Sequence, residues 1–290
     1  SASGDFGMIL EFLESWTLFS RTYISALLIG ASLSLMGVVV VARGNIFVAA
    51  AVAQASMLGV ALSLFFGIGQ PVLSAVFCSV GASLLIARKH QEGGASTSEE
   101  MTGWIFLVGG SFSVLLLARM PYGLKEIQSL FSSSIIGASS SDIIVFGILL
   151  FIFVGFLVIW SRRLTLYLSD PVMASAVGSN IFLWSIGIAS SLGLATGLAI
   201  RSSGMLFTFG AMVLPAQMAK IICRNISGMF LVAPVVALLS IMFGLVLGNY
   251  YDLPPAQTVV ALMCFLLLVT WIFRWIYDAV FLVRDTGMGD

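Results

Sequence analysis

Long runs of apolar residues, separated by short polar connections, make up most of this chain. A helix of about 20 apolar residues crosses a hydrocarbon layer of about 30 Å, whereas β-barrel strands alternate over segments of about ten residues. The runs therefore predict an all-α, polytopic helical membrane protein with about 8–9 transmembrane helices. The predicted spans are Tyr23–Val41, Ile46–Gly67, Pro71–Ala87, Met101–Ala118, Ile143–Trp160, Ile181–Ile200, Gly204–Ile222, Met229–Leu247 and Thr258–Ile276.

These spans follow one another too closely to leave a boundary between two domains. We predict a transmembrane domain at residues 21–283 and a cytoplasmic tail at 284–290. The N-terminal segment, residues 1–20, lacks the basic region of a secretory signal and has the apolar spacing of a helix lying in the membrane interface. Its first residues, Ser1–Gly7, are interpreted as in part a cloning remnant.

Composition supports the membrane assignment and excludes several other classes. The chain is 60% hydrophobic and only 9% charged, whereas soluble domains carry about 25% charged residues. Its 13 basic and 13 acidic residues balance, which argues against nucleic acid as a partner. Its three cysteines lie inside apolar runs at unrelated spacings, so neither a disulfide framework nor a thiolate metal site is expected.

The basic residues predict the orientation, because cytoplasmic loops of membrane proteins are enriched in Lys and Arg. The larger set occupies every second junction: Arg43, Arg88, Lys89, Arg162, Arg163, Lys220, Arg224, Arg274 and Arg284. The smaller set occupies the other junctions: Arg21, Arg119, Lys125 and Arg201. We therefore expect the N-terminus outside and the C-terminus in the cytoplasm.

No catalytic residue is predicted. The carboxylates lie at span ends or in connections, and the single histidine, His90, begins a polar connection that we expect to be a cytoplasmic loop, His90–Glu100. Catalytic motifs and nucleotide-binding glycine loops are absent from the sequence. Active transport would therefore need an energy-supplying partner.

Two spans carry polar residues that suggest a lining role. Gln54 is an amide in the middle of an apolar helix, where it must find a partner or face water, and Ala50 lies one turn earlier on the same face. In the span Gly204–Ile222, Pro215 is expected to bend the helix, and Thr208 and Gln217 are its polar side chains. The bend is either a packing feature or a hinge.

The connection between Ser161 and Asn180 is expected to contain a short capped helix. Asp170 is placed to cap a helix that begins at Pro171, and Gly178 can close it. From these residues alone, the helix is either a structured loop or a docking element for a soluble partner.

Small residues recur four apart at Gly193 and Gly197, at Gly244 and Gly248, and at Gly30 and Ser34. Such pairs let membrane helices approach closely. They predict either packing within one bundle or a dimer seam.

The chain from Tyr23 to Trp271 resembles the membrane permeases of bacterial ABC importers for zinc, manganese and iron. Six segments in order carry the resemblance: Val38–Gly67, Ser98–Phe106, Ser129–Phe146, Ser169–Gly178, Ser202–Ile222 and Tyr251–Val260. The resemblance implies a multi-pass protein of the bacterial cytoplasmic (inner) membrane, acting as one of two permease copies or paralogues. Its expected partners are a cytoplasmic ABC ATPase, which binds ATP-Mg, and an extracytoplasmic solute-binding protein.

The resemblance also implies roles for particular residues. The coupling helix for the ATPase would comprise Asp170, Pro171, Val172, Ala174, Val177 and Gly178. The translocation path would be lined by Ala50, Gln54, Met57, Thr208, Pro215 and Gln217. No cofactor is expected in this chain itself, and the expected substrate is a divalent metal ion.

One departure from the family pattern concerns that substrate. Where the family usually carries an Asp and a His one turn apart, this chain has Ala50 and Gln54, which offer no charge to a bare divalent ion. No metal ligand is assigned. Four alternatives stay open: a metal site elsewhere, a chelate or small organic solute, the ligand-poor half of a heterodimer, or a non-transporting scaffold or sensor.

Overall fold

The computed structural model describes residues 2–120, 125, 128, 130 and 140–286, and over these residues the chain is helical, without strands. The described residues contain eight candidate membrane spans, two of them within α3 and none in the short α6, which confirms the all-α membrane prediction. The helices are α1 (Ala2–Ala42), α2 (Ile46–Phe66), α3 (Pro71–Ala118), α5 (Ser140–Ser169), α6 (Pro171–Ala176), α7 (Ile181–Ile222), α8 (Ile226–Tyr250) and α9 (Pro255–Thr286).

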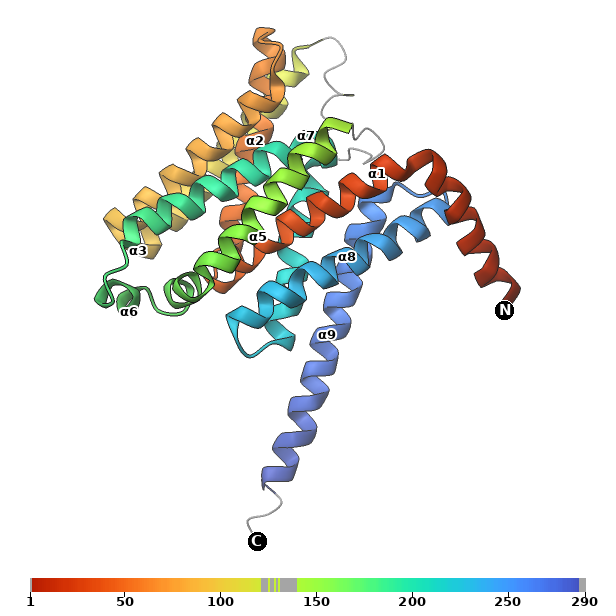
Figure 1. Cartoon of the computed structure of the whole chain (residues 1–290). Helices are drawn as coiled ribbons and strands as arrows, with labels where there is room; N and C mark the ends of the chain where they lie inside the picture. Colours follow the sequence, from red (N-terminus) through yellow and green to blue (C-terminus); the bar gives the residue numbers. More distant parts are fainter. Residues whose placement is uncertain (1, 121–124, 126–127, 129, 131–139, 287–290) are drawn as a thin grey trace.

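Three sequence predictions concern the ends of the chain and one long connection. Residues 2–20 form the first part of α1, which bends near its N-terminal end in Figure 1. Helix α9 continues to Thr286, so the first residues of the predicted tail are helical and the last four lie outside the described residues. The segment Ser129–Phe146, which carries part of the family resemblance, also lies outside them up to residue 139, apart from Leu130.

Helix α3 supplies two of the spans and turns back on itself. Its candidate spans are Pro71–His90 and Ser96–Ala118. Gly59 of α2 packs against Ser74, and Gln54 of α2 packs against Gly109. A straight helix would hold Ser74 and Gly109 about 50 Å apart, whereas Gln54 and Gly59 are separated by only about 8 Å along α2. Helix α2 therefore lies against both halves of a folded-back α3.

The connection between these halves corrects one expectation. The segment His90–Glu100 is helical throughout, so its prediction as a loop was wrong. The segment contains no proline, and its Gln, Glu and Ala residues favour helix, whereas its two glycines, Gly93 and Gly94, allow the chain to turn between the two halves of α3.

Helix α7 also contains two predicted spans. Its backbone breaks at Gly204, where φ is 75° and ψ is 166°, a conformation that glycine adopts far more readily than other residues. The predicted runs Ile181–Ile200 and Gly204–Ile222 lie on the two sides of this break. Figure 1 shows α7 changing direction along its length. The expected bend at Pro215 is therefore not the main break, which lies eleven residues earlier.

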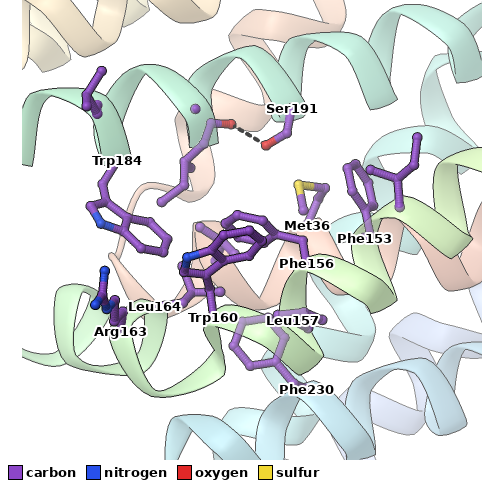
Figure 2. Close-up of a pocket in the computed structure, with 15 residues that line it drawn as sticks. Met36, Phe153, Phe156, Leu157, Trp160, Arg163, Leu164, Trp184, Ser191 and Phe230 are labelled. Carbon is purple, nitrogen blue, oxygen red and sulfur yellow. Dashed lines mark hydrogen bonds between the residues drawn. The ribbon is translucent and has the colours of Figure 1, made fainter.

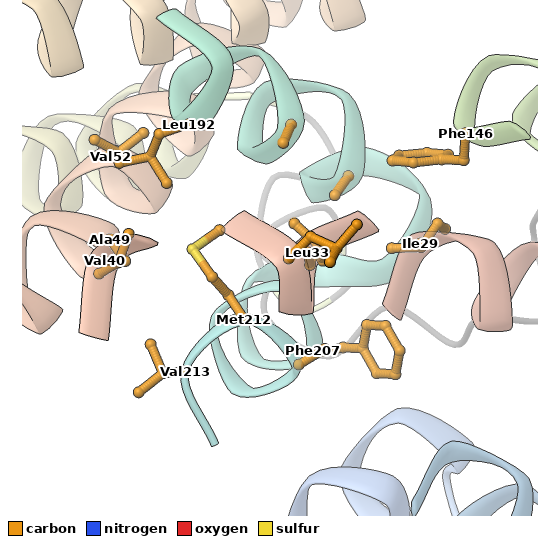
Figure 3. Close-up of a cluster of buried hydrophobic side chains, with 14 of the residues drawn as sticks. Ile29, Leu33, Val40, Ala49, Val52, Phe146, Leu192, Phe207, Met212 and Val213 are labelled. Carbon is orange, nitrogen blue, oxygen red and sulfur yellow. The ribbon is translucent and has the colours of Figure 1, made fainter. Parts of the chain in front are cut away.

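The core is centred on α1 and α2, the two spans with the largest buried share. Ile29 and Leu33 of α1 pack in one apolar cluster with Phe207 and Met212 of α7, as Figure 3 shows. Large apolar side chains on the outer helices remain exposed, for example Phe151 of α5 and Phe243 of α8. An outer surface of this kind is stable in hydrocarbon, which agrees with a membrane location.

The small residues that recur four apart pack against other helices of the same chain. A Cβ atom added to Gly193 would lie 2.6 Å from the Cα of Val80, and one added to Gly244 would lie 2.7 Å from the Cα of Val259. The hydroxyl of Ser79 donates a hydrogen bond to the carbonyl oxygen of Gly193 at 2.7 Å. These contacts join α7 to α3 and α8 to α9, so packing within one bundle is the use that the structure shows.

Replacing Gly193 by Leu is expected to force α7 away from α3 and to destabilise the fold by about 1–3 kcal/mol, a typical cost of overpacking. The measurement is the thermal unfolding midpoint of the purified protein in detergent. Gly187→Leu is the matched control, because a Cβ atom at Gly187 meets nothing within 4 Å on the same helix. Equal midpoints for the two variants would contradict the close approach of these helices.

Candidate functional site

The short helix α6 has the cap that the sequence predicts. One carboxylate oxygen of Asp170 accepts hydrogen bonds from the backbone N–H groups of Val172 at 2.9 Å and Met173 at 3.0 Å. Pro171 occupies the first turn, where its missing N–H costs nothing. Gly178, at φ 82°, follows the helix and lets the backbone turn away. A helix of one and a half turns is thereby fixed at both ends.

The apolar side chains of α6 and of its C-cap residue, Val177, point in two directions. Ala174 is fully buried, whereas Val172 is 79% exposed and Val177 69% exposed. Exposed aliphatic side chains on a rigid, capped helix form a small convex surface. Such a surface can fit a groove on a soluble protein.

Beneath α6 lies an apolar and aromatic cluster that joins three parts of the chain. Ala174 packs with Tyr167 of α5 and Val39 of α1, and Trp184 of α7 packs against this cluster. The rings of Tyr167 and Trp184 are stacked with centroids 5.9 Å apart. The guanidinium carbon of Arg43 lies 4.8 Å from the Tyr167 ring centroid, a cation–π geometry.

This arrangement connects α6 to the turn between α1 and α2. Tyr167 precedes α6, Trp184 follows it, and Arg43 stands in that turn just before α2 begins. Our sequence reasoning assigned no role to Tyr167 or Trp184. The available signal was an aromatic residue on each side of a capped helix.

On α2, Gln54 is buried at the interface with α3. Its side chain is 6% exposed, and its Oε1 atom has no hydrogen-bond partner among the described residues. A Cβ atom on Gly110 would lie 3.2 Å from that oxygen, so the glycine leaves room for the amide. Ala50 is also buried. A buried hydrogen-bond acceptor without a partner lowers the stability of the fold, because its lost hydration is not replaced. It marks a position where water or a ligand is commonly bound.

On α7, Thr208 lies at the Gly204 break. Its hydroxyl donates to the Gly204 carbonyl oxygen at 2.6 Å and lies 3.1 Å from the hydroxyl oxygen of Ser203. Met57 of α2 is fully buried in a cluster with Ile200, which lies just before the break. Helix α2 therefore meets α7 at this point.

The other two predicted lining residues of α7 lie elsewhere. Pro215 is buried and Gln217 is half-buried. Ala216, between them, packs near Gly37 of α1 and in a cluster with Met229 of α8. The six predicted lining residues thus fall into two groups, one around α2 and the Gly204 break and one between α7, α1 and α8.

The candidate site offers neutral ligands. Within the part of the chain that the structure describes, no group of three or more His, Cys, Asp and Glu side chains could hold a metal ion. The polar atoms near α2 and the α7 break are an amide oxygen and hydroxyls. They can bind a neutral group by hydrogen bonds but cannot neutralise a bare divalent cation.

Comparison with known proteins gives a family and a fold. The sequence profile described as "ABC 3 transport family" matches residues 15–274. The manganese transport system membrane protein MntC of Listeria monocytogenes is 21% identical over 266 residues, which are 92% of this chain and 94% of that protein. The high-affinity zinc uptake system membrane protein ZnuB of Haemophilus influenzae is 25% identical over 250 residues, 84% of this chain and 95% of that protein.

A solved structure shares the fold. The structure of PsaBC from Streptococcus pneumoniae in complex with Fab superposes with a TM-score of 0.79 at 16% identity, covering 91% of this chain and 95% of that chain. At this identity the likeness concerns the arrangement of helices. It extends over nearly the whole bundle described above.

Proposed function

Because the chain belongs to the ABC 3 transport family, we propose that it is the membrane permease of an importer that moves a divalent metal ion or a metal chelate across the bacterial cytoplasmic membrane. The relatives described as manganese and zinc transport proteins support this class of substrate. The chain acts with a cytoplasmic ABC ATPase, an extracytoplasmic solute-binding protein and a second permease copy or paralogue. ATP-Mg binds to the ATPase, and no resident cofactor is assigned to this chain.

The proposal is carried by the structure and the exposed side chains of the short helix α6. It is capped at both ends, anchored through Ala174 and exposes Val172 and Val177. In this proposal the ATPase seats α6 in a groove, and Asp170–Gly178 is the coupling helix. Tyr167 and Trp184 pack in the cluster beneath α6. Movement of α6 therefore passes through these two residues to the start of α2 and to α7.

The path would then open by alternating access of helices α2 and α7. Gln54 on α2 and the Gly204 break of α7 lie where a helix shift would change the packing. Thr208 and Met57 flank this region, whereas Pro215 and Gln217 lie further along the same helix. The basic residues at the α6 end of the spans support a cytoplasmic position for α6, with the N-terminus outside and the C-terminus inside.

A chelated metal, or a permease partner that supplies the charged ligands, is the second candidate. It is favoured by the neutral pair Ala50 and Gln54, because a bare divalent ion at this level would lose its hydration without a compensating charge. Either case keeps the ABC importer mechanism and changes only what Gln54 contacts.

The proposal is tested by reconstitution. The chain is purified with its cognate ATPase into proteoliposomes, and uptake of Mn²⁺, Zn²⁺ and chelated iron is measured with the solute-binding protein and ATP. We expect uptake of at least one substrate that requires ATP and the ATPase. An assembled complex without ATP-dependent uptake of any of the three would instead favour a non-transporting scaffold or sensor.

A further inference from the structure

An apolar groove lies between α1, α5, α7 and α8, away from the residues assigned above to the path. Its volume is about 390 Å³, and its lining includes Met36, Phe153, Phe156, Trp160, Trp184 and Phe230. Several lining side chains are partly exposed, for example Ile152 at 56% and Leu183 at 64%, so the groove opens sideways. Helix α5 is the most hydrophobic of the candidate spans, and the opening therefore faces hydrocarbon.

The two ends of the groove differ in chemistry, one being charged and the other apolar. Arg163 is the single charged residue among those that line it. In Figure 2, Arg163 lies at the end of the groove marked by Trp184, while Phe153 and Met36 lie towards the other end. Tryptophan and arginine side chains favour the level of lipid headgroups, whereas Phe and Met side chains are stable in hydrocarbon. The Arg163 end of the groove therefore lies nearer the membrane surface.

A second cavity adjoins this basic end. It has a volume of about 230 Å³, shares Arg163 with the groove and adds Arg162, together with Gly178 and Ser179 that follow α6. Both arginines are exposed, and neither forms an ion pair among the described residues. Guanidinium groups can bind a phosphate through paired N–H donors, and two of them line this one cavity.

We propose that these two cavities form one binding site for an anionic phospholipid. An acyl chain fills the groove beside Phe153 and Phe156, and the phosphate lies between Arg162 and Arg163. A lipid fits better than a protein segment because the apolar part opens to hydrocarbon and ends at a pair of cations at headgroup level. The lipid headgroup would contact the residues that close α6, so the occupied site adjoins the proposed coupling helix.

The proposal depends on the membrane location of α5 and is independent of the transported substrate. The two tryptophans of the groove provide a direct probe. Replacing Trp16, Trp104, Trp271 and Trp275 by Phe leaves Trp160 and Trp184 as the only tryptophans, because the chain has six. The full-length variant is reconstituted into phosphatidylcholine vesicles that contain brominated phosphatidylglycerol or, at the same mole fraction, brominated phosphatidylcholine. Bromine quenches tryptophan fluorescence on contact.

We expect the anionic lipid to occupy the site about tenfold more readily than the zwitterionic lipid, because each arginine near the surface favours an anionic headgroup. Half-maximal quenching should therefore occur at a correspondingly lower mole fraction of brominated phosphatidylglycerol. Arg162→Gln combined with Arg163→Gln should remove this preference and leave quenching by brominated phosphatidylcholine unchanged. Arg274→Gln, at an exposed arginine on α9, is the matched control and should retain the preference.

Three outcomes would overturn the proposal. Equal quenching by the two lipids would show that the arginines select no headgroup. Preserved preference in the Arg162 and Arg163 variant would place the anion elsewhere. Absence of quenching by either lipid would show that protein, such as a second copy of this chain, covers the groove.

Discussion

Combining Asp170→Lys with Val177→Asp is expected to abolish binding of the ATPase and ATP-dependent uptake. The first substitution removes the carboxylate that accepts the N–H groups of Val172 and Met173, a cap of about 1 kcal/mol. It also places a positive charge at the positive end of the helix dipole. The second places a charge on a side chain that is 69% exposed and that the proposal buries against the partner. The measurement is co-purification of the ATPase, followed by uptake in proteoliposomes.

The control for this variant is Arg224→Asp, which changes an exposed charge in the turn between α7 and α8 and leaves α6 intact. It should retain the ATPase. Asp170 and Val177 cap the two ends of α6, and both are exposed, so the permease itself should stay folded, as its thermal unfolding midpoint can show. A folded double variant that still binds the ATPase and transports would disprove the assignment of α6 as the coupling helix.

Combining Ala50→Asp with Gln54→His is expected to change ion selectivity by about tenfold or more, equivalent to 1.4 kcal/mol. The two side chains stand one turn apart, and carboxylate with imidazole ligates Mn²⁺ or Zn²⁺, which the neutral pair does not. The contact of Gln54 with Gly110 leaves space for the imidazole, because a glycine presents no side chain there. The measurement is the ratio of Mn²⁺ to Zn²⁺ uptake in the reconstituted importer.

The matched control is Ala50→Asn in the presence of the native Gln54. It has the shape of the aspartate without its charge, and the selectivity ratio should stay close to that of the native protein. If the Asp/His variant is folded, binds its ATPase and shows the native ratio, this face of α2 does not line the path.

The capped helix α6 is predicted from the sequence, but its connection to the other helices is not. That connection runs through Arg43, Tyr167 and Trp184. Asp170, Pro171 and Gly178 already predict a capped helix, because each of their interactions joins residues at most a few positions apart. The stack beneath the helix joins residues from α1, α5 and α7. The sequence offers only an aromatic residue on each side of α6 as a signal, because the stack itself depends on how three helices meet.

The sequence by itself determined the helical membrane fold, most of the spans and the short helix α6. These features depend on the length of apolar runs and on hydrogen bonds between near neighbours. Gly204 and Pro215 show the limit of this reasoning. Proline predicts a bend from its missing N–H, yet the helical backbone of α7 is interrupted at a glycine, which adopts a φ of 75° more readily than other residues.

Only the tertiary structure decided what Gln54 contacts. The amide could have faced water, lipid or another helix, and it lies against Gly110 because α3 folds back over α2. The groove that ends at Arg163 is likewise made by four helices and is invisible in any one of them. Contacts between distant segments depend on packing angles and side-chain volumes, which the order of apolar and polar residues does not specify.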